Sequence, residues 1–195
     1  VSRIEQGKNT APALMTLAEA GAALTHAAGR EGGIVLSDGQ RAGAEKLLTS
    51  HDRYVGVQGL AGVGKTKMFE VVREVAAERG VEIAGLAPTH QAAEALSKGA
   101  GIESGTVESF LQRYEGLMTR AETGGAGAGL DQARESWAKK TLLVDESSML
   151  SNSQADRLMR VSETLQIPRI IFVGDEKQLG SPEAGAPWRL VLEEG

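Results

Sequence analysis

The chain has 195 residues, no cysteine, 41% hydrophobic residues and a formal net charge of −5. This length supports one sizeable hydrophobic core, and the ordinary hydrophobic content excludes a largely disordered chain. The acidic balance argues against nucleic-acid binding by overall charge, and an aromatic content of 4% disfavours an extended base-stacking surface.

The composition also bears on location. No apolar run approaches the roughly 20 residues that a membrane-spanning helix needs, so we expect no membrane insertion. The first ten residues lack the apolar centre of a secretory signal, and there is no initiator methionine, so we interpret the chain as a piece of a longer protein. The absence of cysteine fits a reducing, cytoplasmic compartment.

Residues 1–33 are interpreted as a linker with one N-terminal helix. Apolar residues recur at roughly helical spacing over residues 11–29, where Pro12 suits the first turn and Gly29 the end. The apolar face is rich in alanine, which favours a marginal helix that joins an upstream domain. Residues 34–195 are assigned to one nucleotide-binding domain.

Strand-like and helix-like segments alternate through this domain. Ser37 is a candidate N-cap for a helix over about residues 40–49. The alternation predicts an α/β fold with a parallel sheet and helices on both faces. The predicted strands are 54–58, 82–87, 141–144 and 169–173. The predicted helices between them are 65–78, 91–97, 107–114 and 153–165.

Residues 119–139 interrupt this alternation. The segment contains the run GGAGAG at residues 124–129 and shows no steady hydrophobic period. We interpret it as a mobile surface loop, in preference to a second glycine-rich phosphate site.

Residues 59–66 read GLAGVGKT and match the pattern G-x-x-x-x-G-K-[ST] of a phosphate-binding loop. Its glycines let backbone N–H groups approach phosphate oxygens. Lys65 would reach the β- and γ-phosphates of ATP, and the hydroxyl of Thr66 would bind Mg²⁺. The helix that begins near Lys65 directs its positive end at the phosphates. The predicted nucleotide-binding residues of this loop are Gly59, Gly62, Val63, Gly64, Lys65, Thr66 and Lys67.

Two further strand ends carry polar residues suited to ATP hydrolysis, and phosphate sites lie at this edge of parallel sheets. Asp145 would complete the Mg²⁺ site, and Glu146 would activate or position the attacking water. A solvated acidic turn is the alternative for this pair. Gln178 follows the last strand, and its amide could sense the γ-phosphate, although a polar turn would also account for it. Lys65, Glu146 and Gln178 are therefore the candidate catalytic residues.

Six ordered strings resemble the first RecA-like domain of superfamily 1 helicases of the RecD-like branch. They are especially similar to the helicase region of conjugative relaxase-helicases. The strings are LSDGQRAG, VQGLAGVGKTK, GLAPTHQAA, GTVESFL, LLVDESSML and VGDEKQL, and they span about residues 36–187. The resemblance implies a RecA-like P-loop NTPase that uses ATP and Mg²⁺ to move along single-stranded DNA in conjugative plasmid transfer.

The resemblance also implies residue roles. Gln40 would read adenine through its amide, which suits the edge of that base. Thr89, His90 and Thr106 would contact single-stranded DNA, with the two threonine hydroxyls on phosphates. Phe110 is expected in the core rather than between bases.

Partners follow from the same resemblance. A second RecA-like domain of the parent chain would supply an arginine to the γ-phosphate, and an upstream relaxase domain and conjugation machinery are candidate partners. We expect these 195 residues alone to bind nucleotide weakly, hydrolyse it slowly and not separate DNA strands. Two alternatives stay open: a docking module of a large conjugation protein, and a P-loop ATPase whose target is not DNA.

Overall fold

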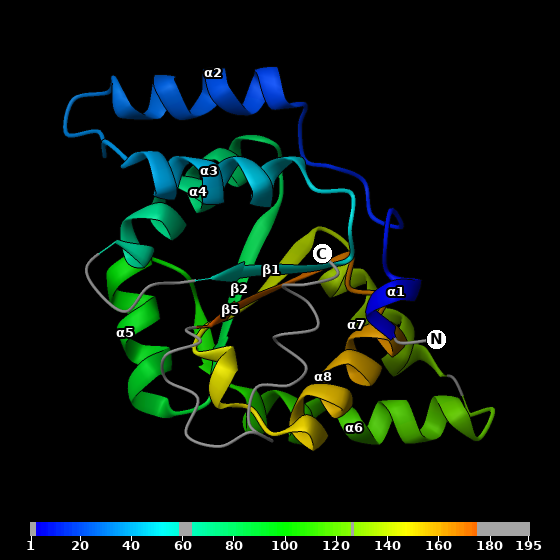
Figure 1. Cartoon of the computed structure of the whole chain (residues 1–195). Coiled ribbons are helices and arrows are strands. Elements are labelled where there is room, and N and C mark those ends of the chain that lie inside the picture. Colours follow the sequence, from blue (N-terminus) through cyan, green and yellow to red (C-terminus); the bar gives the residue numbers. More distant parts are fainter. Residues whose placement is uncertain (1–2, 59–63, 126, 175–195) are drawn as a thin grey trace.

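A sheet of five parallel strands lies at the centre of residues 3–58, 64–125 and 127–174, which are those that the computed structural model describes (Figure 1). Its strand order is β1-β5-β4-β2-β3, and every neighbouring pair is parallel. The predicted α/β fold is therefore confirmed. The strands are β1 (Tyr54–Gln58), β2 (Glu82–Ala87), β3 (Ser104–Thr106), β4 (Lys140–Val144) and β5 (Arg169–Gly174).

Helices cover both faces of this sheet. Successive strand residues enter opposite cores, so that Leu142 packs on one face and Leu143 on the other. Burial on both faces explains why the strands read as continuous apolar runs. The face of Leu142 is covered by α6 (Val107–Glu122), α7 (Ala128–Trp137) and α8 (Asn152–Thr164). The face of Leu143 is covered by α2 (Leu17–Ala28), α3 (Asp38–Thr49), α4 (Lys65–Glu78) and α5 (His90–Ala100).

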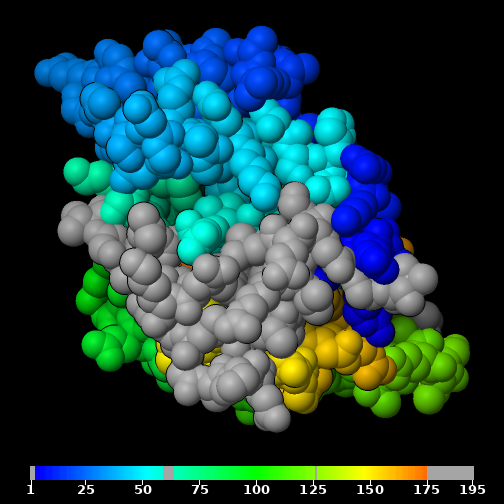
Figure 2. Space-filling view, viewed as in Figure 1, coloured from blue at the N-terminus to red at the C-terminus, as the bar shows by residue number. Residues whose placement is uncertain are grey.

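The N-terminal helix begins later than the sequence pattern predicts. A capping box at Thr16, completed by Glu19, starts α2 at Leu17, whereas we expected the first turn near Pro12. The Ala11 amide instead donates to the backbone of a residue just before β1. Figure 2 shows α2 and α3 side by side at one end of the molecule, and the buried Leu24 of α2 joins the core there. The domain boundary at residue 33 stays a prediction.

The interpretation of residues 119–139 as a loop is wrong. Helix α6 continues to Glu122, and α7 occupies most of the rest. Leu130, Ala133 and Trp137 recur at helical spacing and are buried against the core. The preceding glycines hid this short period from sequence analysis. The three-residue strand β3 and the short helix α1 (Arg3–Gln6) were also not predicted.

A buried arginine fastens the N-terminal segment to the domain. Arg169 in β5 is 2% exposed, and burial lowers the pKa of its guanidinium from its ordinary value. The guanidinium donates to backbone carbonyls of Pro12 at 2.9 Å, Ser50 at 2.5 Å and Asp52 at 3.3 Å. These hydrogen bonds compensate the buried positive charge in place of water. Because one of them goes to Pro12, the segment before α2 is part of the packed structure.

None of the helices in the described ranges is both long enough and apolar enough to cross a membrane.

A buried tyrosine predicts a specific loss of stability at alkaline pH. Tyr54 is 2% exposed and donates its hydroxyl to Glu163 at 2.9 Å; burial first, and then the Glu163 carboxylate, raise its pKa above the ordinary value. A raised folded pKa gives stability that is complete below the unfolded pKa of about 10 and is lost as pH rises beyond it. At pH 7 we expect Tyr54→Phe to lower the free energy of unfolding by about 1–3 kcal/mol, the value of a hydrogen bond to a charged group, and so to unfold at a lower temperature. Above pH 10 the stability of this variant should decline less steeply than that of the unchanged chain. Thermal melts from pH 7 to 11 measure this, and identical slopes for both proteins would contradict it.

Candidate functional site

The end of the phosphate loop and the acidic strand end meet at the carboxyl edge of the sheet. Helix α4 begins at Lys65, directly after Gly64, and Asp145 directly follows β4. The Lys65 Nζ lies 3.6 Å from the Asp145 Oδ1, and their side chains are 19% and 18% exposed. Folding therefore brings together a cation suited to phosphates and an anion suited to a metal ion, although the two motifs are far apart in the sequence.

The chain turns sharply at the acidic pair. The Asp145 amide donates to the Leu86 carbonyl at 2.9 Å, which holds the end of β4 beside β2. The Asp145 carboxylate accepts the Glu146 amide at 2.9 Å. Glu146 has a φ of 50° and a ψ of 32°, a left-handed conformation that costs a residue with a side chain about 1–3 kcal/mol. This turn ends the strand at once and starts the short helix η1 (Ser147–Met149), so backbone strain lies at the residue predicted to act on water.

Gln40 contacts the phosphate loop directly. Its Nε2 donates to the Gly64 carbonyl at 3.0 Å, and its Oε1 accepts the Ser37 amide at 2.8 Å in the capping box of α3. A Cβ on Gly64 would lie 2.4 Å from that Nε2, so glycine is needed at this position for the contact. An amide can form four hydrogen bonds, which leaves one donor and one acceptor for an adenine. The adenine-reading role stays a prediction.

A second glycine supports the loop from α5, and no motif pointed to it. A Cβ on Gly99 would lie 2.5 Å from the Thr66 Cγ2, so a side chain there would displace Thr66. Helices α4 and α5 pack together through this close approach. Thr66 and Lys67 themselves are exposed at the start of α4, as a ligand-binding hydroxyl and a nearby cation would be.

These residues fit ATP with Mg²⁺. A threonine hydroxyl and a carboxylate are the oxygen ligands that Mg²⁺ accepts, and an ammonium at a helix N-terminus suits phosphates. The carboxylate is already held near the ammonium at Lys65, and Thr66 follows directly in the chain. The predicted loop residues Gly59, Gly62 and Val63, and also Gln178, lie outside the described residues.

The predicted DNA contacts gather at the ends of two neighbouring strands. Thr106 ends β3 and pairs in register with Ala87, the last residue of β2, and Thr89 and His90 follow two and three residues later. Thr89 and His90 are exposed, whereas Thr106 is 6% exposed. Each threonine caps a helix by accepting an amide at 3.1 Å, and its hydroxyl can still donate to a phosphate. Their contact with DNA stays a prediction.

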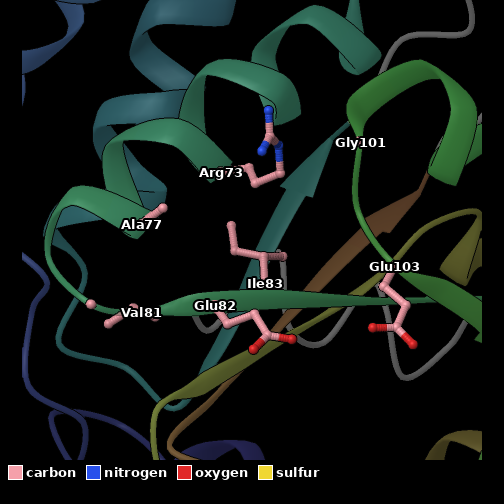
Figure 3. A pocket seen from close by; sticks show the side chains of 8 residues that line it. Arg73, Ala77, Val81, Glu82, Ile83, Gly101 and Glu103 are labelled. Atoms are coloured by element: carbon pink, nitrogen blue, oxygen red, sulfur yellow. The ribbon is translucent and has the colours of Figure 1, made fainter.

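A hollow of about 370 Å³ lies at the other edge of the sheet, where β2 begins (Figure 3). It is bounded by α4, the start of β2 and the residues before β3. Lys65 and Asp145 lie at the carboxyl ends of the strands, so this hollow is separate from the candidate nucleotide site. Its lining residues are Arg73, Ala77, Gly80, Val81, Glu82, Ile83, Gly101 and Glu103.

Comparison with known proteins gives consistent matches. The sequence model of a family described as "AAA domain" matches residues 35–195. The chain is 32% identical over 160 residues to "Multifunctional conjugation protein TraI" of Escherichia coli K12, which covers 80% of this chain and 8% of that protein. It is also 32% identical over 163 residues to "Conjugal transfer protein TraA" of Agrobacterium fabrum C58, covering 81% of this chain and 13% of that protein. The chain thus spans a small part of the length of these relatives.

Proposed function

The chain belongs to the AAA domain family, and from this membership we propose that it is the ATP-binding motor domain of a DNA helicase or translocase. Its resemblance to the RecD-like helicases of conjugation is confirmed by the matched family and relatives. The contact between Lys65 and Asp145 carries the proposal, because it joins the phosphate loop to the acidic strand end in one site. Neither motif alone would specify hydrolysis.

The residues of this site take separate roles in ATP hydrolysis. Lys65 would pair with the β- and γ-phosphates, and Thr66 and Asp145 would hold the metal ion. Mg²⁺, when bound, offsets the charge of the phosphate oxygens. Glu146 positions the attacking water and accepts its proton. A second RecA-like domain supplies the arginine that stabilises the transferring phosphoryl group.

The proposed DNA contacts lie one strand away from the proposed nucleotide site. Strand β2 pairs with β4 along its length, and the Asp145 amide bonds to Leu86 of β2. Thr89 and His90 follow β2 directly, at the N-terminus of α5, where backbone amides and the helix dipole favour a phosphate. A change at Asp145 on hydrolysis therefore reaches the DNA contacts through one shared pair of strands, and repeated cycles move the domain along single-stranded DNA.

The proposal is tested with these 195 residues and with the parent protein. We expect the 195 residues to hydrolyse ATP well below the roughly 1 s⁻¹ of slow enzymes, because an arginine worth ~10³–10⁵ in rate comes from elsewhere. They should not separate a labelled duplex, and strand separation at ordinary enzyme concentrations would contradict the proposal. The parent protein should bind single-stranded DNA more weakly as salt rises; absence of binding at low salt would favour an ATPase with another target.

A further inference from the structure

Helix α5 extends from the predicted DNA contacts to the predicted metal ligand. It begins at His90, directly after its N-cap Thr89, and both are predicted to contact DNA. Its last turn contains Gly99, which packs on Thr66, the predicted ligand of Mg²⁺. Gly99 follows Thr89 by ten residues, which correspond to about 15 Å of helix. One helix thus contacts both the proposed DNA site and the proposed metal site.

The C-terminal end of α5 is fixed against α4. The Arg73 Nε of α4 donates to the Ala100 carbonyl at 3.0 Å, and Gly101 ends α5 in a left-handed conformation with a φ of 65°. Leu96 and Ala100 are buried in the same core as the inner face of α4, and Figure 1 shows the two helices side by side. The position of Gly99 relative to α4 is therefore set by a hydrogen bond and by packing.

The contact at Gly99 involves the methyl group of Thr66 rather than its hydroxyl. A Cβ on Gly99 would lie 2.5 Å from the Thr66 Cγ2 and 3.7 Å from its Oγ1. A threonine in a helix divides between two χ1 rotamers, and a rotation of about 120° between staggered rotamers moves the hydroxyl. Packing of the methyl against the bare backbone of Gly99 favours the rotamer found here, and it thereby fixes the direction of the hydroxyl.

We propose that Gly99 is a positioning residue for Mg²⁺, which holds the Thr66 hydroxyl in the direction that the metal ion requires, and that DNA bound at the start of α5 strengthens Mg²⁺ binding through this contact. The proposal rests on the proposed function, which supplies the roles of Thr66 and of the DNA contacts. DNA that orders α5 narrows the space left for the Thr66 methyl, so Mg²⁺ then binds at a lower cost in conformational entropy. This link is separate from the strand pair at Asp145, because it reaches the metal ion through its other proposed ligand.

Gly99→Ala tests the positioning role. The methyl of Thr66 can rotate away from the added Cβ, so we expect the fold to survive and the hydroxyl to turn. Loss of groups that orient metal ligands typically costs 10–100-fold in metal affinity, so the Mg²⁺ concentration for half-maximal binding of a fluorescent ATP analogue should rise about ten-fold. Affinity for the same analogue in EDTA should stay within about two-fold, because Lys65 and the loop amides bind phosphates without the metal ion.

Two further variants distinguish positioning from a general structural effect. Thr66→Ser removes the methyl and keeps the hydroxyl, so in this background Gly99→Ala should alter the half-maximal Mg²⁺ concentration by less than about two-fold. Gly116→Ala makes the same change on an exposed glycine of α6, where the nearest atom to the added Cβ is the Arg120 Nη2 at 3.9 Å. Helix α6 packs on the opposite face of the sheet, where Phe110 is buried in the core as predicted, so Gly116→Ala should leave Mg²⁺ binding unchanged.

The link to DNA is measured by repeating the Mg²⁺ titration with saturating dT₁₂ at low salt. Coupling between two linked sites typically changes affinity by 5–150-fold, so we expect dT₁₂ to lower the half-maximal Mg²⁺ concentration of the unchanged chain by about five-fold or more. In Gly99→Ala the same oligonucleotide should change this concentration by less than about two-fold, because the added methyl has already displaced the Thr66 side chain.

Three results would overturn this proposal while leaving the proposed function intact. They are an unchanged Mg²⁺ dependence in Gly99→Ala, an equal loss from Gly99→Ala in the Thr66→Ser background, and equal responses to dT₁₂ in the unchanged chain and Gly99→Ala. By contrast, binding of the ATP analogue that does not respond to Mg²⁺ in the unchanged chain would contradict the proposed metal site itself. Failure of the unchanged chain to bind dT₁₂ would contradict both the link to DNA and the proposed DNA function.

Discussion

Lys65→Ala should weaken ATP binding by about 30-fold to several thousand-fold. Removing one member of a close, partly buried charge contact costs about 2–5 kcal/mol or more, and each 1.4 kcal/mol is a factor of ten in affinity. The change also leaves the Asp145 carboxylate, 18% exposed, without the ammonium 3.6 Å away. Titration of the 195-residue chain with ATP and Mg²⁺ measures the dissociation constant.

The matched control is Lys139→Ala. Lys139 is exposed and immediately precedes β4, at the edge of the sheet away from Asp145. Its carbonyl accepts the Glu82 amide, and that bond survives the substitution. We expect ATP affinity within two-fold of the unchanged chain for this control, on the order of what surface substitutions do. Equal ATP affinity in Lys65→Ala and the unchanged chain would show that the phosphate loop does not bind ATP.

Glu146→Gln should uncouple ATP binding from hydrolysis. The amide keeps the size of the side chain and its left-handed backbone conformation, but it cannot accept a proton from water. General-base catalysis typically contributes 10²–10⁴ in rate, so we expect the single-turnover hydrolysis rate to fall by about that factor. ATP affinity should change by less than about three-fold, because the proposed role of Glu146 is to act on the water and not to bind the phosphates.

Glu31→Gln provides the comparison for this prediction. Glu31 is exposed between α2 and α3, so the same change there should leave both affinity and rate unaltered. A large loss of ATP affinity in Glu146→Gln would instead show that Glu146 helps to hold the metal ion. A hydrolysis rate that does not fall would favour the alternative interpretation, in which Asp145 and Glu146 form a solvated acidic turn.

The strained turn at Glu146 makes the position of this residue depend on Asp145. Its amide is held by the Asp145 carboxylate at 2.9 Å, so the metal-binding candidate also fixes the turn that places its neighbour. Under the proposed function, Asp145 would hold the metal ion with the same carboxylate that fixes this turn. The two acidic residues are therefore coupled through the backbone as well as through the chemistry that we propose.

Long periodic elements could be predicted from the sequence because local chemistry decides them. The helix over residues 65–78 is found with the predicted bounds, and the strand predicted over residues 141–144 begins one residue earlier. In these segments the hydrophobic period, the length and the flanking turn residues agree. Helix α7 was missed because its ten residues bury only one narrow stripe and follow a glycine run that is typical of a loop.

The sequence alone determined the residue types of the candidate site, their order, and the strands and helices that carry them. A pattern of glycines, lysine and threonine is local, so it can be read without a fold. Only the tertiary structure decided the 3.6 Å approach of Lys65 to Asp145, the bond from Gln40 to Gly64, and the close packing of Gly99 on Thr66. Each of these depends on the order of strands in the sheet and on how closely helices pack, which are set by long-range burial rather than by neighbours in the chain.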